Sequence, residues 1–434
     1  MHENSSTKRV SDQPGWATAE EHYAELYNTM SEELRRDMAA IDIQAIAREG
    51  ALRRSKNCDI SERFAYGGYH IVFELVFEDG VVWISQVYRD SRRKEANVSH
   101  KYVKTHMESS ICTMNYVRKH TNLPVPKVHA WDTSEPNSVG GAWMMMDVAL
   151  GCNRAAIPDT DDRIVNDVFM AHHADTLLQL SALQFSEIGL LQESEDGGVH
   201  VGPFVDFDGT EYGPFSTSTQ YYQHMVNILW KHRTLTKFKD HDVMVRQLFP
   251  LYLYQLSVSL LDFRDVGPFP LFHTDLTINI LLNEEGHMAG IIDWDWSGPV
   301  PWLAQCMRPE GIVPQWRLDG MYRPDILKSI EDQRHRFEQM LDEKQAKLSK
   351  ASSLPNLVAT MNTPEVELAE AIVHYSEPRF KDSGEWVFRI LFGDGLDFEK
   401  MRKSVFNSEM MKTKLRELGV TGINSDGIET NGEA

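Results

Sequence analysis

The sequence predicts an α+β protein in which a small antiparallel sheet precedes a larger, mainly helical part. Apolar residues alternate with period two from Cys58 to Tyr88, whereas beyond residue 152 they recur mostly at helical spacing. A third observation is the compact stretch Leu271–Trp302, which reads as a loop followed by a β-hairpin with polar residues at its ends. We expect this hairpin to carry the functional site.

The composition is that of a globular protein with more than one domain. The 434 residues are 42% hydrophobic and 25% charged, which is enough to build a large core. No run of 18 apolar residues and no apolar leader occurs, so we expect a cytoplasmic protein without a membrane span. The four scattered cysteines form no C-x-x-C pair, which argues against a disulfide framework or a zinc site.

The charge and the missing motifs narrow the choice of partners. A formal net charge of −20 disfavours nucleic acid and anionic membranes as partners. The sequence has no Walker A motif, no G-x-S-x-G elbow and no zinc pattern. We therefore expect neither nucleic acid nor an anionic membrane as a partner, and no protein partner can be named from the sequence.

Two segments precede the sheet. Residues 1–15 are polar and are expected to form a disordered tail. Residues 16–58 are expected to form a helical extension, because apolar side chains such as Tyr23 and Leu34 recur at helical spacing. Neither segment carries a catalytic pattern.

Residues 59–150 are expected to form the small β part. One strand runs to a turn at Gly67 and Gly68, a second ends at an Asp-Gly turn, and a third covers residues 81–88. A helix follows over residues 103–117, where apolar side chains return every three or four positions. Two further strands then complete the sheet.

Residues 151–415 are expected to form the larger helical part, and residues 416–434 a polar tail. The predicted hairpin interrupts these helices. It places Asp275 in a loop, Asn279 at the entry of a strand and Asp293 at the exit of the next strand. A carboxylate base and two oxygen ligands around one point are what Mg²⁺-assisted phosphoryl transfer needs.

At these residues the chain resembles the aminoglycoside/choline phosphotransferases, which are small-molecule kinases of protein-kinase-like fold. The resemblance is carried by His273-Thr274-Asp275, Ile292-Asp293-Trp294 and Pro299-Val-Pro301-Trp302, and it is greatest for the fungal-type branch. It implies a two-lobed fold, with ATP and Mg²⁺ as cofactors. It also implies transfer of the γ-phosphate to a hydroxyl of a small metabolite.

The resemblance also implies roles for individual residues of the hairpin. Asp275 would be the catalytic base, with His273 beside it in the catalytic loop, and Asn279 and Asp293 would hold Mg²⁺. The family usually places its Asn five residues after the base, whereas four separate Asn279 from Asp275 here.

The implied nucleotide site lies in the small β part. Gly67 and Gly68 would cover the phosphates with backbone N–H groups. The stretch Asp147–Cys152, which includes Ala149, would meet the adenine through its backbone. The strand position that carries Lys or Arg in the family matches Gln86, and the helix position of its Glu partner matches Ser110.

Losing both members of this ion pair leaves other functions open. Arg89 is a poor substitute for the lysine, because strand side chains alternate and place it on the face opposite Gln86. One alternative is a degenerate, pseudokinase-like protein that binds a ligand without turnover. Another is a kinase fold repurposed for different small-molecule chemistry.

Overall fold

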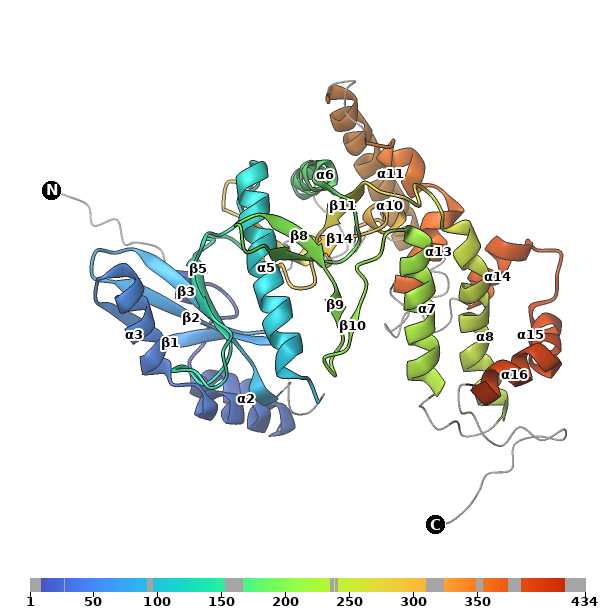
Figure 1. Ribbon diagram of the computed structural model, residues 1–434. Coiled ribbons are helices and arrows are strands. Elements are labelled where there is room, and N and C mark those ends of the chain that lie inside the picture. Colours follow the sequence, from blue (N-terminus) through green and yellow to red (C-terminus); the bar gives the residue numbers. More distant parts are fainter. Residues whose placement is uncertain are drawn as a thin grey trace, which may run out of the picture. The chain divides into compact units, whose positions relative to one another are not determined.

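The computed structural model describes residues 9–26, 28–91, 97–152, 167–234, 238, 241–309, 324–348, 354–373 and 384–417 (Figure 1). The chain divides into two compact units. The first unit comprises Met1–Gln184, Gly189–Pro214 and Leu271–Pro299, and the second comprises Phe185–Ile188, Phe215–Pro270 and Val300–Ala434. The expected combination of a small antiparallel sheet with a larger helical portion is confirmed. Among the described helices, none is long and apolar enough to cross a membrane.

The small sheet of the first unit has five antiparallel strands in the order β1-β2-β3-β5-β4. Its bounds are β1 Cys58–Tyr66, β2 His70–Phe77, β3 Val82–Tyr88, β4 Val128–Asp132 and β5 Trp143–Asp147. The strands predicted from the period-two pattern are therefore present, with β1 beginning at the last residue of the expected helical extension.

The two faces of this sheet have different neighbours. One face packs against α2 (Asn28–Ala40) and α3 (Ile43–Arg54) through a core that includes Phe73, Leu75 and Trp83. The opposite face is called the site face below. Strand alternation and the β2–β3 and β3–β5 registers place on it His70, Val72, Glu74, Ile84, Gln86, Tyr88, Met144 and Met146.

The N-terminal segment is more ordered than the expected tail. Val10–Asp12 form a short 3₁₀ helix (η1) in which Val10 and Ser11 are buried. Ala17 then bridges to Phe64 on β1, and α1 follows over Ala19–Glu25. The expected disorder is therefore wrong for the described residues from position 9 onward. These residues contact the sheet, and their contacts cannot be predicted from the local sequence.

Helix α5 (His100–His120) begins at the Ser99 cap, whose side chain accepts a hydrogen bond from the backbone of Tyr102. Eleven of its residues are buried, so it is a core helix of the first unit, extending the predicted 103–117 segment at both ends. The unit further contains α6 Asp167–Ala182, β7 Leu190–Glu193, β8 Val199–Gly202, β9 Phe204–Val205 and β10 Glu211–Tyr212.

Most of the predicted hairpin, from Leu271 to Pro299, also belongs to the first unit. Its elements are β11 Phe269–Phe272, α9 Leu276–Asn279, β12 Ile280–Leu282, β13 Met288–Ile291 and β14 Gly298–Pro299. Strands β14, β11 and β6 (Gln184–Phe185) form a three-stranded sheet, while β12 and β13 pair with each other. The structure thus groups the hairpin with the small sheet, although the expected domain boundary near residue 150 separated the two.

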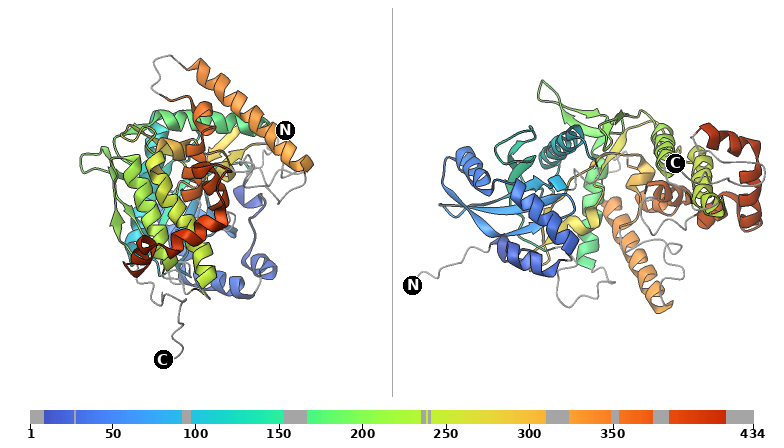
Figure 2. Two further views of the ribbon diagram at one scale, coloured as in Figure 1. Left: turned by 90° about the vertical axis from the view of Figure 1, so that its right-hand side faces the viewer. Right: turned by 90° about the horizontal axis from the view of Figure 1, so that it is seen from below.

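The second unit is helical. Its described elements are α7 Ser218–Thr234, α8 His241–Ser257, η3 Val258–Leu260, α10 Trp302–Gln305, α11 Pro324–Lys347, α12 Leu357–Met361, α13 Pro364–Val373, α14 Gly384–Phe392, α15 Phe398–Asn407 and α16 Glu409–Glu417. Helices α7 and α14 pack against α8, as the yellow-green and red ribbons of Figure 2 show. Most of the expected C-terminal tail, residues 418–434, lies outside the described residues.

Candidate active site

The catalytic loop differs locally from the predicted strand. The sequence predicted Asn279 at the entry of a strand, but Leu276–Asn279 form one helical turn, α9, and the strand begins only at Ile280. This turn resolves the short spacing between Asp275 and Asn279. Residues four apart lie on the same side of a helix, one turn apart, so Asn279 lies next to Asp275.

Asp275 and Asn279 are joined directly. The Asn279 Nδ2 donates a hydrogen bond of 2.8 Å to the backbone oxygen of Asp275. The Asn279 side chain is buried, whereas Asp275 is exposed and accessible to a ligand. Because the amide nitrogen is engaged, the amide oxygen of Asn279 is the atom left to meet a cation.

His273 holds this loop and does not serve as its proton carrier. It is 1% exposed, its Nε2 donates to the Ile292 oxygen at 3.0 Å, and its Nδ1 accepts from the Asp275 backbone at 3.3 Å. Burial lowers the His273 pKa to about 4. The ring therefore stays neutral near pH 7, with both of its nitrogens engaged by the backbone.

The turn after β13 holds two residues in the left-handed region. Asp293 has φ +58° and Trp296 has φ +57°, conformations that are uncommon for residues other than glycine. The backbone N–H of Ile292 donates to the backbone oxygen of Asn279 at 3.1 Å, which ties this turn to the predicted catalytic loop. Thr274 Oγ1 adds a second tie by donating to the Asp295 backbone oxygen at 2.9 Å.

The carboxyl groups of Asp293 and Asp295 both have raised pKa values. The Asp293 side chain is exposed at the surface. Desolvation by the protein around it is the main cause that raises its pKa to about 6, and the Asp295 carboxylate is the second cause. Burial raises the Asp295 pKa to about 6 as well. His70 lies 3.8 Å from Asp295 (Nδ1 to Oδ2), and burial lowers the His70 pKa, so it supplies little compensating charge.

Helix α5 borders these carboxylates. The Trp296 Nε1 donates to the Tyr102 hydroxyl at 2.7 Å, which fastens the turn to the helix. Ser110, at the position predicted for the family's Glu, is 2% exposed. It lies close enough to Asp295 to oppose the rise in that carboxyl's pKa. The predicted helix position therefore faces the site.

The predicted phosphate-binding turn, Gly67–Gly68, is held by residues on the face of the sheet opposite the site face. Gly67 and Gly68 are exposed, and the Gly67 backbone donates to the His70 oxygen at 2.8 Å. Arg89 donates to the Gly67 oxygen at 2.9 Å and pairs with the buried Asp37 of α2 at 2.8 Å. Arg89 therefore points away from the site face, in agreement with the sequence analysis.

The other predicted nucleotide contacts are distributed along the site face and its border. Gln86 is half-buried on that face, in one row with Val72 and Met144. The Asp147 side chain accepts from His129 Nε2 at 2.7 Å and from the Lys127 backbone at 3.3 Å. The Asp147 carboxylate is thus held by His129 of β4 and by the Lys127 backbone, while its side chain remains 47% exposed.

Ala149 packs on the hairpin. A Cβ built on Gly290 of β13 would lie 2.5 Å from the Ala149 Cβ, so only glycine allows this close approach. The structure therefore joins the predicted adenine-binding stretch to the hairpin that carries the catalytic loop.

The folds of solved small-molecule phosphotransferases are similar to this one. A thermostable mutant of the aminoglycoside phosphotransferase APH(4)-Ia is 16% identical, with a TM-score of 0.46 over 81% of this chain and 100% of that chain. That protein has also been solved in a ternary complex with AMP-PNP and hygromycin B. Macrolide 2'-phosphotransferase MphH from Brachybacterium faecium is 12% identical, with a TM-score of 0.39 over 82% and 99%. No protein-family profile and no curated protein matches the sequence.

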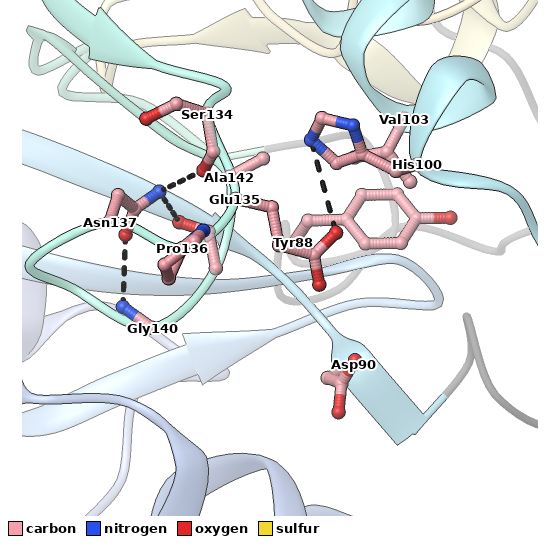
Figure 3. Close-up of a pocket in the computed structure, with 11 residues that line it drawn as sticks. Tyr88, Asp90, His100, Val103, Ser134, Glu135, Pro136, Asn137, Gly140 and Ala142 are labelled. Atoms are coloured by element: carbon pink, nitrogen blue, oxygen red, sulfur yellow. Dashed lines mark hydrogen bonds and ion pairs between the residues drawn. The ribbon is translucent and has the colours of Figure 1, made fainter.

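A separate pocket lies where α5 begins, beside the connection between β4 and β5 (Figure 3). It has a volume of about 160 Å³ and includes none of the predicted site residues. His100 lies at its edge, 3.9 Å from the Glu135 carboxylate, and its Nε2 donates to the Thr133 oxygen at 2.7 Å. This pocket is therefore distinct from the site described above.

Sequence reasoning assigned no role to His70, Tyr102 or Trp296. His70 could have been found, since it stands two residues after Gly68 and alternation places it on the face of Gln86. Trp296 could not, because its contact with Tyr102 joins positions 194 residues apart.

Proposed function

We propose that this protein is a small-molecule kinase that transfers the γ-phosphoryl group of ATP to a hydroxyl. The observation that carries the proposal is one hydrogen-bonded unit around the exposed Asp275. His273 holds its backbone nitrogen, Asn279 holds its backbone oxygen, and Ile292 links both to Asp293. A base, an amide ligand and a carboxylate ligand on one rigid loop match what phosphoryl transfer requires.

The residues present fit a magnesium ion. The hydrogen bond of Asn279 uses its amide nitrogen and leaves its amide oxygen for a cation, and Asp293 supplies an exposed carboxylate with a second carboxyl group, that of Asp295, nearby. No group of three or more His, Cys, Asp or Glu side chains among the described residues could hold a metal. This suits Mg²⁺, which uses one or two carboxylates together with substrate phosphates.

In the proposed reaction Asp275 orients the acceptor hydroxyl and takes its proton. The hydroxyl oxygen forms a bond to the γ-phosphorus, the bond to the β-phosphate oxygen breaks, and ADP leaves. Mg²⁺ on Asn279 and Asp293 would neutralise the phosphate charge. His273 keeps the Asp275 backbone in place throughout, because its own nitrogens are both engaged.

The electrostatics also support a second candidate, a protein that binds a small molecule without phosphoryl transfer or that uses the site for other chemistry. Gln86 and Ser110 are neutral at the positions where a kinase would carry a Lys–Glu pair, and Asp293 and Asp295 are two negative groups. Anionic phosphates would lack the lysine that usually holds them.

Substituting the base separates the candidates. We expect Asp275→Asn to slow ADP formation with hydroxyl-bearing acceptors by roughly 10²- to 10⁴-fold, the usual contribution of general-base catalysis. The melting temperature should not change, since Asp275 is exposed.

Glu285→Gln is the matched control, because it removes an exposed carboxylate from the turn of the same hairpin. Near wild-type turnover in Asp275→Asn would rule out Asp275 as the base.

A further inference from the structure

The site face of the sheet already holds a ligand that belongs to the chain itself. Glu74, which is 0% exposed, accepts hydrogen bonds from Arg9 Nε at 2.9 Å and Arg9 Nη2 at 2.6 Å. It also accepts from the Ser11 backbone at 3.2 Å and the Ser11 hydroxyl at 2.6 Å. A carboxylate in mid-strand is thereby satisfied entirely by a segment 63 to 65 positions earlier.

This contact lies where a nucleotide base would be expected. Glu74 is on the same face as His70 and four residues further along β2, a separation of about 13 Å. It stands in one row with Ile84 and Met146, immediately before the 147–152 stretch predicted to meet adenine. If the phosphates lie under the Gly67–Gly68 turn, the rest of the nucleotide must extend along β2 toward this row.

We propose that the segment Arg9-Val10-Ser11 is a displaceable ligand of the site face and that it competes with nucleotide for that face. The competition rests on the proposed kinase function, whereas the attachment of the segment to Glu74 does not. The segment is recognised as a guanidinium and a hydroxyl that converge on one carboxylate.

The contacts allow the segment to leave without unfolding the sheet. Among the described residues, the side chains of Arg9 and Ser11 hydrogen-bond to Glu74 alone, Val10 is the one buried apolar side chain of the segment, and the Arg9 side chain is still 42% exposed. The backbone pairing of Ala17 with Phe64 holds the chain independently, six residues after Ser11. Displacement would open Glu74 to a new donor, such as the amino group of a base, so the carboxylate would exchange one partner for another.

The first test uses the full chain with Arg9→Ala and Ser11→Ala together. A ligand's apparent affinity falls by the fraction of protein that is competent to bind. We expect the double variant to bind MgATP about tenfold more tightly than wild type by calorimetry. In wild type, hydrogen exchange at the amides of residues 10–13 should accelerate when MgATP is added. Equal affinities together with unchanged exchange would overturn the proposal.

The second test requires no nucleotide. A synthetic peptide of residues 7–14 should bind to the double variant, whose own segment is detached, and binding should be lost when Glu74→Gln is added. The same peptide with phosphoserine at position 11 should not bind, because its phosphate would face the Glu74 carboxylate.

The two tests separate the two proposals. Peptide capture that depends on Glu74, combined with no MgATP binding by any variant, would leave the cis ligand in place and remove the kinase function. No peptide capture, with exchange at residues 10–13 as slow as in the core strands, would show a permanent structural contact and contradict the inference.

Discussion

In the proposed site, cation binding depends on the carboxyl group of Asp293. Its pKa is raised to about 6, chiefly by burial, which disfavours the charged form, and secondarily by the neighbouring Asp295 carboxylate. A raised pKa means that the group takes up a proton as the pH falls through 6, and a protonated carboxyl is a poor ligand. We therefore expect Mg²⁺-dependent nucleotide binding to weaken between pH 7.5 and pH 5.5.

Asp295→Asn tests that cause. Removing the second negative charge should lower the pKa of Asp293 only in part, because burial remains the larger cause, so Mg²⁺-dependent binding should weaken at a lower pH than in wild type. Titrations of MgATP at both pH values measure the shift. Identical pH profiles for wild type and Asp295→Asn would show that Asp295 does not influence the ligand carboxylate.

The lowered pKa of His273 predicts how the stability of the fold depends on pH. Its folded pKa of about 4 lies below the ordinary 6.5, so the unfolded chain binds more protons between these values. Stability from the neutral ring is present above pH 6.5 and is lost as the pH falls through 4, by about 3 kcal/mol. Asp293 and Asp295 act with the opposite sign, because their folded pKa values are raised.

The comparison with His273→Gln isolates the histidine from these opposing groups. Glutamine cannot gain a proton, so the stability difference between wild type and variant should shrink by about 3 kcal/mol from pH 7 to pH 4. Urea unfolding at several pH values measures it. A difference that stays constant across this range would mean that His273 is not held neutral by the fold.

At the scale of elements, the one-turn helix α9 explains why a shortened loop can still form the site. The sequence motif singles out Asp275, Asn279 and Asp293, whose roles stay predictions, and hydrogen bonds link the loop and the turn that carry them. The strand pattern was insufficient to predict α9, since Ile278 reads as the start of a strand but is 49% exposed on the helical turn. Hydrogen bonding within the loop overrides the propensity of four residues.

Two glycines of the site should respond differently to alanine. Gly290→Ala should cost about 1–3 kcal/mol of stability, because its Cβ would lie 2.5 Å from that of Ala149. Gly68→Ala should leave stability within about 0.5 kcal/mol, since nothing lies within 4 Å of its Cβ. It should nevertheless weaken MgATP binding, because the added methyl group stands where a phosphate would approach the backbone.

Gly395→Ala is the matched control, since its Cβ also meets nothing within 4 Å and it lies in the second unit. Thermal unfolding and MgATP titration of the three variants measure both effects. Unchanged nucleotide affinity in Gly68→Ala would remove the Gly67–Gly68 turn from the site.

At the scale of the whole molecule, the sequence was informative about classes of structure and poor at long-range pairings. The antiparallel small sheet and the helical remainder followed from periodicity. The order of residues 9–12 did not, because the partner of Arg9 is Glu74, and no local pattern links them. The grouping of the hairpin with the small sheet also depends on contacts between distant segments, such as Trp296 with Tyr102.

Calorimetric titration of ATP with and without Mg²⁺ tests most directly whether Asp293 and Asn279 form the cation site of a kinase. Wild type should bind ATP in the presence of Mg²⁺ and much more weakly in its absence. Asp293→Ala should bind equally weakly under both conditions, because the carboxylate ligand is gone. Equal ATP affinity of the wild type with and without Mg²⁺, or no binding at all, would contradict the account.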